Sequence, residues 1–311
     1  MTAVQSLPEG RLLVDLGFRD SDGIIASYLL PEEEGWALVE VGPTTCRSGL
    51  LRGLREAGVE PREVRDVFVT HIHLDHAGGL GALVEELPRA QFYAHESGLP
   101  HLVDPSRLVE SARRAWGEAS DTLWGAVLPV PPGRLRALRG GERFPLRSGT
   151  LEVLPTPGHA RHHLSFWDSG ASAVMTGDGA GVLLPGARHV RPAVPPPDLD
   201  IPRFLDSLEV VRRRDPSWLW FSHFGPYDRA SQRLDEVARG VREWTSVAEE
   251  VLGRGGGVAE IEEALAALER DRARREGEGE DLVARTGTIS SLRLAAAGLY
   301  RYLTRTRVST R

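Results

Sequence analysis

The 311-residue sequence contains no lysine, so all 38 residues counted as lysine or arginine are arginines. This absence excludes any mechanism that depends on a lysine side chain. The sequence has a single cysteine, Cys46, which excludes an internal disulfide framework and a metal site built from several thiolates. We expect Cys46 to pack as a small apolar side chain.

Long apolar runs are also missing. No segment reaches the roughly 18 to 20 consecutive apolar residues that a membrane-spanning helix needs, and residues 1–10 lack the basic and apolar regions of a secretory signal. The net charge of −6 offers no excess of positive charge for binding nucleic acids or membrane surfaces. We therefore expect a cytoplasmic protein that binds neither nucleic acid nor membrane.

The first 228 residues have the pattern of an α/β domain. Short runs of branched and aromatic residues bounded by Gly, Asp or Pro predict strands, and runs with apolar residues at helical spacing predict helices. This scheme occurs twice, which indicates two sheets with outer helices. We expect strands at 12–16, 24–30, 36–41, 67–70, 91–95, 151–154, 164–167, 173–176 and 218–222, and helices at 46–57, 77–87, 105–125 and 201–214.

The pattern after residue 228 is helical. Amphipathic helices are predicted at 231–252 and 258–275, and a final helix at 282–302. We therefore divide the chain into a catalytic domain, residues 1–228, and a small helical extension, residues 229–311. The extension either covers the mouth of a site in the first domain or forms a homodimer interface. Its polar cluster either contacts an anionic substrate or is a solvated surface; the cluster consists of Tyr300, Arg301, Tyr302 and Arg305.

The clearest chemical signal is the segment THIHLDHAGG at residues 70–79, directly after a predicted strand. In extended backbone, side chains two positions apart project to the same side, so His71 and His73 can bind one ion. Where the chain turns toward a helix, Asp75 and His76 can face a second ion. Three imidazoles and one carboxylate within six residues are typical of a metal site.

Three more side chains that can bind metal follow predicted strands. They are His159, Asp178 and His223, each directly after the carboxyl end of an apolar run. Each of them alone is more often an ordinary polar residue. Because loops converge at the ends of strands, their occurrence together with the first segment predicts one shared site.

The order HxHxDH, His, Asp, His resembles that of the metallo-β-lactamase-fold hydrolases over residues 10–227. The resemblance implies an αββα sandwich and two divalent metal ions, usually zinc and sometimes iron or manganese. The family's first aspartate, at a strand end, is replaced here by Glu40, which leaves the local role of that residue open. By position, the resemblance implies that His71, His73 and His159 hold the first ion, that Asp75, His76 and His223 hold the second, and that Asp178 bridges both.

Two such ions imply a hydrolytic mechanism. They share a water molecule and lower its pKa, which produces a metal-bridging hydroxide as the nucleophile, while one ion polarises the substrate oxygen. Asp75 or Asp178 then shuttles a proton to the leaving group. Glu40, Thr70 and Ser222 are candidates to orient the ligand histidines through hydrogen bonds.

The other polar candidates are less informative. His162 and His163 follow His159 closely and either support the ligands, contact the substrate or have a structural role. Tyr227 lies near His223 in sequence and is a candidate for the wall of the pocket. Positions at the surface or at helix ends are expected for His95, His101 and His189.

The resemblance therefore implies a dinuclear metal-dependent hydrolase that cleaves a small ester, thioester or lactone. Thioester hydrolases of the glyoxalase II type share the full ligand set and a helical extension, although residues 179–182 differ from the glutathione-site sequence of that group. A lactonase also remains open. The alternatives are a phosphodiesterase or nuclease, an iron-dependent oxidoreductase of the same fold, and a metal-stabilised protein without catalysis.

Overall fold

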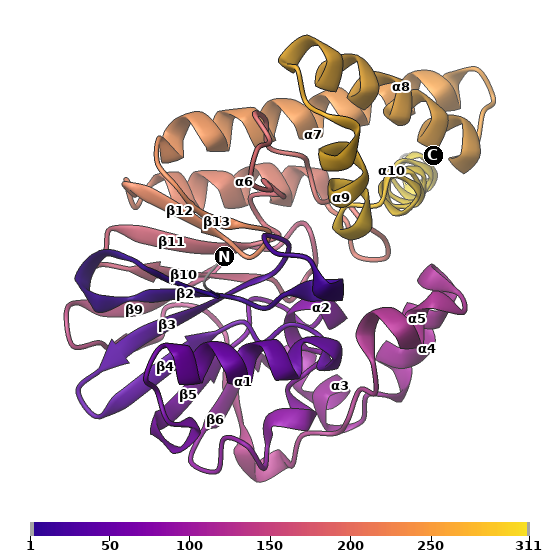
Figure 1. Ribbon diagram of the computed structural model, residues 1–311. Helices are drawn as coiled ribbons and strands as arrows, with labels where there is room; N and C mark the ends of the chain where they lie inside the picture. Colours follow the sequence, from indigo (N-terminus) through magenta and orange to yellow (C-terminus); the bar gives the residue numbers. More distant parts are fainter. Residues whose placement is uncertain (1–2, 310–311) are drawn as a thin grey trace.

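The computed structural model describes residues 3–309 and arranges them as two facing β-sheets with helices on both outer sides (Figure 1). Within these residues the first sheet has seven strands in chain order and the second has six in the order β13-β12-β11-β10-β9-β8. The α/β sandwich expected from the sequence is thus confirmed. The strands are β1 Val4–Ser6, β2 Leu12–Asp15, β3 Ala26–Glu32, β4 Gly35–Val39, β5 Val64–Phe68, β6 Gln91–His95, β7 Leu135–Leu138, β8 Arg143–Pro145, β9 Thr150–Pro155, β10 Leu164–Asp168, β11 Ala173–Gly177, β12 Trp218–Phe221 and β13 Gly225–Tyr227.

The strand directions bring several loops to one edge. In the second sheet, β10 pairs antiparallel with both β9 and β11, and β11 pairs parallel with β12. The strands β9, β11 and β12 therefore run in the same direction, and their carboxyl ends lie at the same edge. In the first sheet β4, β5 and β6 are parallel neighbours, so the segment after β5 also leaves its sheet at a common edge.

The helices cover the outer faces of both sheets. The first sheet is covered by α1 to α3, and the second by α6 and α7, on which α8 and α10 pack, whereas α9 packs against the apolar cluster of the first sheet (Figure 1). Within the described residues no helix combines the length and the apolar character needed to cross a membrane. The helices are α1 Arg47–Glu56, α2 Leu74–Ala77, α3 Leu99–Val103, α4 Ser106–Trp116, α5 Ala119–Trp124, α6 Ile201–Arg212, α7 Ala230–Gly253, α8 Val258–Glu276, α9 Glu280–Ile289 and α10 Leu292–Ser309.

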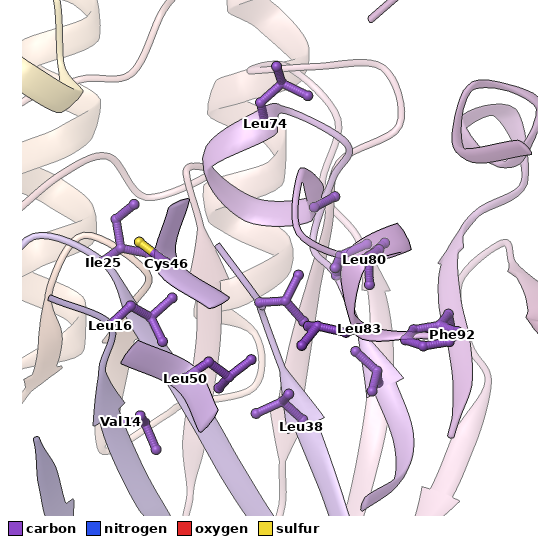
Figure 2. Close-up of a cluster of buried hydrophobic side chains, with 14 of the residues drawn as sticks. Val14, Leu16, Ile25, Leu38, Cys46, Leu50, Leu74, Leu80, Leu83 and Phe92 are labelled. Atoms are coloured by element: carbon purple, nitrogen blue, oxygen red, sulfur yellow. The ribbon is translucent and has the colours of Figure 1, made fainter. Parts of the chain in front are cut away.

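Apolar side chains fill the space between the sheets and beneath the helices. Aromatic pairs join the two sheets: the rings of Tyr28 and Trp220 stack with centroids 5.3 Å apart, and Phe68 meets Phe166 at 5.5 Å. On the outer face of the first sheet, Cys46 is buried among aliphatic side chains (Figure 2). Its apolar role is confirmed, and burial raises the pKa of its thiol to about 12.

Three helices expected from the sequence differ in the structure. The expected helix at 77–87 is wrong, because α2 ends at Ala77 and only a short 3-10 turn follows. Gly79 instead passes close to the backbone of Gly42, and a Cβ on Gly79 would lie 3.0 Å from the carbonyl oxygen of Gly42. The expected helix at 105–125 is broken at Gly117, which has a φ of 61°. The final helix is broken at Ser290 into α9 and α10.

Four short strands, β1, β7, β8 and β13, were not expected from the sequence. They lie at sheet edges, and each has only three or four residues. The division of the chain into residues 1–228 and 229–311 stays a prediction. One apolar cluster crosses this boundary, because α6, α7, α8 and α10 all contribute to it.

Ion pairs fasten residues 188–197, here called the 188–197 loop, to α8. His189 lies between two carboxylates, with Nδ1 2.7 Å from Glu276 Oε2 and Nε2 3.2 Å from Glu269 Oε2. Arg191 Nε lies 3.4 Å from the same Glu269 oxygen, and Glu269 Oε1 accepts a hydrogen bond from the buried Trp244 indole. This network connects the helical extension to the sandwich.

We expect His189 to give the free energy of unfolding a specific dependence on pH. Burial alone lowers the pKa of His189, but the hydrogen bonds with Glu269 and Glu276 outweigh burial and raise it. A raised pKa in the folded state means that this stabilisation is fully present below the ordinary value of about 6.5 and is lost as the pH rises through the raised pKa. Urea unfolding between about pH 5.5 and pH 8.5 should show a steeper loss of stability in the wild type than in His189→Gln. Equal slopes would contradict the role of this ion pair.

A buried ion pair joins the two sheets at Arg11 and Asp168. Arg11 Nε and Nη2 donate to the two carboxylate oxygens of Asp168 at 2.8 Å, and both side chains are fully buried. Asp168 also accepts backbone hydrogen bonds from Gly170 and Ala171. The carboxylate therefore fixes both the first sheet and the turn after β10.

Asp168→Ala should lower the free energy of unfolding by about 3–5 kcal/mol, because it leaves the Arg11 guanidinium buried without its counter-charge. The matched control is Asp121→Ala, which breaks an exposed pair with Arg113 and should change stability by no more than about 0.5 kcal/mol. Chemical denaturation followed by circular dichroism measures both. Equal losses in the two variants would refute the assignment.

Candidate metal centre

All seven ligand candidates from the sequence lie at one edge of the sandwich. His71 and His73 follow β5, and α2 then carries Asp75 and His76. The three later candidates follow strands whose carboxyl ends share this edge. Backbone hydrogen bonds hold the facing loops together, for example Leu164 N to Thr70 O at 2.8 Å. The three later candidates are His159 after β9, Asp178 after β11 and His223 after β12.

The first group consists of His71, His73 and His159 with Asp178. His71 Nε2 and His159 Nε2 each lie 3.0 Å from His73 Nδ1. His71 and His159 are buried, whereas His73 is partly exposed. Three ring nitrogens thus converge on one point.

The second group consists of Asp75, His76 and His223. His76 Nε2 lies 3.2 Å from His223 Nε2, and Asp75 Oδ2 lies 3.5 Å from the same nitrogen of His223. Asp75 lies on the first turn of α2, one position before His76. The short helix therefore turns both side chains toward the imidazole of His223.

Asp178 lies between the two groups. Its Oδ1 is 3.4 Å from both His76 Nε2 and His223 Nε2, and its Oδ2 is 3.4 Å from His159 Nε2. One carboxylate oxygen therefore faces each group. Within the part of the chain that the structure describes, no side chain donates a well-oriented hydrogen bond to the buried Oδ1.

The electrostatics of the first group favour neutral imidazoles. Burial, and then the neighbouring histidines, hold the pKa of His71 well below its usual value, and burial with the nearby His159 lowers the pKa of His73 to about 4. Burial also lowers the pKa of His159, although Asp178 opposes this effect. Neutral imidazoles keep the lone pair that a metal ion requires.

In the second group, neighbouring carboxylates raise the pKa of a histidine instead of leaving it lowered. Burial alone lowers the pKa of His76, but the carboxylates of Glu40, Asp75 and Asp178 outweigh burial and raise it well above its usual value. Burial alone would raise the pKa of Asp178. The nearby imidazoles outweigh burial and hold this pKa well below its usual range. The carboxylates therefore favour a positive charge at this group.

The donor set fits divalent metal ions. In a tetrahedral site with metal–nitrogen bonds of about 2.0–2.1 Å, two ligand atoms lie roughly 3.3–3.4 Å apart. The nitrogen separations of 3.0 Å and 3.2 Å and the oxygen–nitrogen separations of 3.4 Å in the two groups are close to this value. The buried Asp178 oxygen without a well-oriented donor is a natural metal ligand.

Glu40 connects the residues that hold the ligands. Thr70 Oγ1 donates to Glu40 Oε1 at 2.5 Å and lies 3.0 Å from His71 Nδ1. The same Glu40 oxygen is 3.3 Å from His76 Nδ1 and from the hydroxyl of Ser222. Thr70 and Ser222, both expected to orient ligands, therefore meet the carboxylate of Glu40, the third such residue. Glu40 contacts His76 of the second group directly and His71 of the first group through Thr70.

Backbone carbonyls orient two further ligands, and sequence reasoning missed them. His159 Nδ1 lies 2.9 Å from the carbonyl oxygen of Ala193, and His223 Nδ1 lies 3.0 Å from that of Ile24. Every residue has a carbonyl group, so no sequence pattern identified these two. Ala193 belongs to the 188–197 loop, which the helical extension holds in place.

His163 supports the turn that carries Asp178. Its Nδ1 lies 2.9 Å from Thr156 Oγ1, and its Nε2 accepts a hydrogen bond from Gly179 N at 3.1 Å. Gly177 has a φ of 51°, and a Cβ there would lie 2.5 Å from Thr70 Oγ1. The turn that carries Asp178 is therefore held by His163 after Asp178 and by Thr70 before it.

His162 packs beside the first group without joining it, and Tyr227 lies apart from both groups. His162 is buried, its ring stacks at 6.2 Å from that of His71, and burial with the neighbouring imidazoles lowers its pKa to about 2. The hydroxyl of Tyr227 donates to the carbonyl of Leu183 at 2.9 Å. The described residues that line the cavity beside the site include neither side chain.

A cavity of about 660 Å³ borders the metal centre. Four of the candidate ligands, His73, Asp75, His159 and Asp178, contribute to its wall. The members of the polar cluster in the extension have different surroundings. Arg301 lines the cavity and donates to the carbonyl of Pro197 at 3.2 Å, whereas Tyr300 and Tyr302 pack against the apolar cluster of the carboxyl-terminal helices.

Comparisons with known proteins agree with this geometry. The sequence profile of the Metallo-beta-lactamase superfamily matches residues 20–223. The chain is 28% identical over 162 residues to the metallo-beta-lactamase fold-containing protein ST1585 of Sulfurisphaera tokodaii, covering 51% of this chain and 60% of that protein. It is 28% identical over 164 residues to a hydroxyacylglutathione hydrolase of Synechococcus sp. (strain JA-2-3B'a(2-13)), covering 51% of this chain and 52% of that enzyme. The chain thus spans less than two thirds of the length of these two relatives.

A solved structure shares the fold over most of the chain. The metallo-beta-lactamase family protein TTHA1429 from Thermus thermophilus matches with a TM-score of 0.65 and 22% sequence identity. The match covers 92% of this chain and 89% of that chain. At this identity the likeness concerns the fold alone.

Asp178→Ala should bind fewer than two equivalents of zinc, because its two oxygens face both groups. We expect the wild type, stripped with a chelator and titrated with zinc by calorimetry, to bind two equivalents. His101→Gln is the matched control, since His101 lies on α3 outside both groups, and it should retain both equivalents. Two tightly bound ions in Asp178→Ala would refute the bridging position.

Proposed function

The chain belongs to the metallo-beta-lactamase superfamily, and we propose that it is a dinuclear metal-dependent hydrolase that cleaves a small ester, thioester or lactone. The observation that carries this proposal is the position of Asp178 between two histidine groups, with one oxygen directed at each. The similarity to a hydroxyacylglutathione hydrolase, an enzyme named for a thioester substrate, supports the choice of reaction.

The proposed metal ligands are those that the geometry groups together. His71, His73 and His159 hold one divalent ion, Asp75, His76 and His223 hold the other, and Asp178 contacts both. Bound ions supply a Lewis acid for the substrate oxygen and lower the pKa of a shared water toward neutrality. Zinc is the proposed metal, because imidazole and carboxylate ligands suit it.

The chain's own residues position the reaction and move its proton. Asp75 and Asp178 both line the cavity, so both carboxylates border the space where a substrate binds. Asp75 Oδ2 faces His223 and His76, at 3.5 Å and 3.8 Å from their Nε2 atoms. We assign Oδ1 of Asp75 to accept the proton of the attacking water and to pass it to the leaving group. Glu40 keeps the Nδ1 side of His76 occupied, so that Nε2 faces the centre.

The competing functions differ in metal content and in substrate. A phosphodiesterase would use the same two ions, and an iron-dependent oxidoreductase of this fold would consume oxygen. The net charge of −6 and the small, partly apolar cavity favour a small carbonyl substrate over a nucleic acid.

Purified protein should contain two zinc equivalents and hydrolyse at least one member of a panel of esters, thioesters and lactones. Asp75→Asn should lower kcat by about 10²–10⁴-fold, because proton transfer contributes a factor of this size, with a smaller effect on KM. Metal content is measured on the same sample, so that a loss of metal is separated from a loss of proton transfer. Hydrolysis of phosphodiesters alone, or one iron with oxygen consumption, would contradict the proposal.

A further inference from the structure

Two segments distant in sequence form opposite walls of the cavity beside the metal centre. One wall comes from α4 and α5 and contains Leu108, Trp116 and Trp124. The other comes from the junction of α9 and α10 and contains Ile289 and Leu294. In Figure 1, α4 and α5 lie at the lower right of the molecule, and α9 and α10 lie above them. The first wall presents mainly apolar side chains, whereas about half of the residues of the second are apolar, so the cavity can hold an apolar group.

The 188–197 loop forms a third wall. Val194 and the three prolines at 195–197 line the cavity. Prolines have no backbone N–H group to donate, so this wall offers apolar contacts and carbonyl oxygens. The loop packs directly on α10, because a Cβ at Gly298 would lie 2.1 Å from the carbonyl oxygen of Val194. The helical extension therefore fixes the position of this wall.

The charged side chains of the cavity, apart from the metal ligands, are all positive. Among the side chains that the structure describes, they are Arg114, Arg293 and Arg301. Arg114 pairs with Glu110, and Arg301 donates to the Pro197 carbonyl. Arg293 forms no ion pair or hydrogen bond with another described residue that would neutralise it, and its side chain is exposed. It is the arginine best able to bind an anionic group of a ligand.

We propose that the substrate is an amphipathic anion: an ester or thioester with an apolar segment that fills this cavity and a separate anionic group that Arg293 binds. The cavity volume of about 660 Å³ lies within the range of sites for drug-sized ligands. This inference rests on the proposed hydrolase function. In the reaction, the oxygen of water bonds to the carbonyl carbon and the carbon–oxygen or carbon–sulfur bond breaks. One water proton passes to the alcohol or thiol, and the other is released to solvent as the acid leaves as a carboxylate.

Three carboxylates test the two parts of the inference without turnover. Suberate has an apolar chain and two charges, octanoate has the same chain length and one charge, and acetate has one charge without the chain. Trp116 and Trp124 line the cavity, so quenching of tryptophan fluorescence in the zinc-loaded protein reports binding. We expect octanoate to bind at least tenfold tighter than acetate and suberate about fivefold tighter than octanoate.

Two variants and one matched control locate the contacts. Arg293→Gln should remove the advantage of suberate over octanoate and leave octanoate binding unchanged. Ala115→Phe, at an exposed position on α4 that lines the cavity, should weaken octanoate binding but not acetate binding. Arg270→Gln removes the same charge from an exposed position on α8 away from the cavity and should change none of the three affinities.

The outcomes separate this inference from the proposed function. Octanoate binding no tighter than acetate, or a suberate advantage that survives in Arg293→Gln, overturns the inference. Hydrolysis of phenyl acetate with no gain in kcat/KM for phenyl octanoate or for the monophenyl ester of suberic acid also overturns it. Binding that follows the expected order without hydrolysis of any ester or thioester supports the ligand class and contradicts the hydrolase function.

Discussion

The carboxylate of Asp178 is buried, and its two oxygens face different groups of imidazoles. A buried charge is costly unless groups of opposite charge or hydrogen-bond donors surround it. The surrounding histidines come from three separate strand ends, those of β5, β9 and β12, so both sheets must be in register before the charge is compensated. The aromatic contacts between Tyr28 and Trp220 and between Phe68 and Phe166 set that register. The geometry of the centre therefore depends on the packing of the sandwich, and divalent ions complete its charge balance.

Much of the fold and the grouping of the centre could be predicted from the sequence. Alternation and turn residues located most strands, and the spacing of His71, His73, Asp75 and His76 indicated two neighbouring groups, because strand and helix geometry fix the directions of nearby side chains. The carbonyls of Ala193 and Ile24 could not be predicted, since they act through tertiary contacts alone. The helix expected after Ala77 failed for a related reason: contact between Gly79 and Gly42 overrides local helical preference.

The cavity depends even more on tertiary structure. Its walls come from α4, the 188–197 loop and the α9–α10 junction, which have no sequence relationship to one another. The break between α9 and α10 at Ser290 was not expected, yet it places residues on both sides of the break at the cavity wall. Most of the cavity wall thus comes from segments outside the ligand pattern, and chains with the same seven ligands can differ in this wall.

The attachment of the 188–197 loop has a consequence for the order in which the chain is made. The loop carries the Ala193 carbonyl that faces His159, but the supports that it receives from Glu269 on α8 and Gly298 on α10 come later in the sequence. During synthesis on the ribosome, the ligand histidines all emerge before residues 269–298 exist, and domains form from the amino terminus onward. A nascent chain can therefore assemble its two sheets first and pair Arg191 with Val182, whereas the contacts of the loop with α8 and α10 form only when the last helices have left the ribosome.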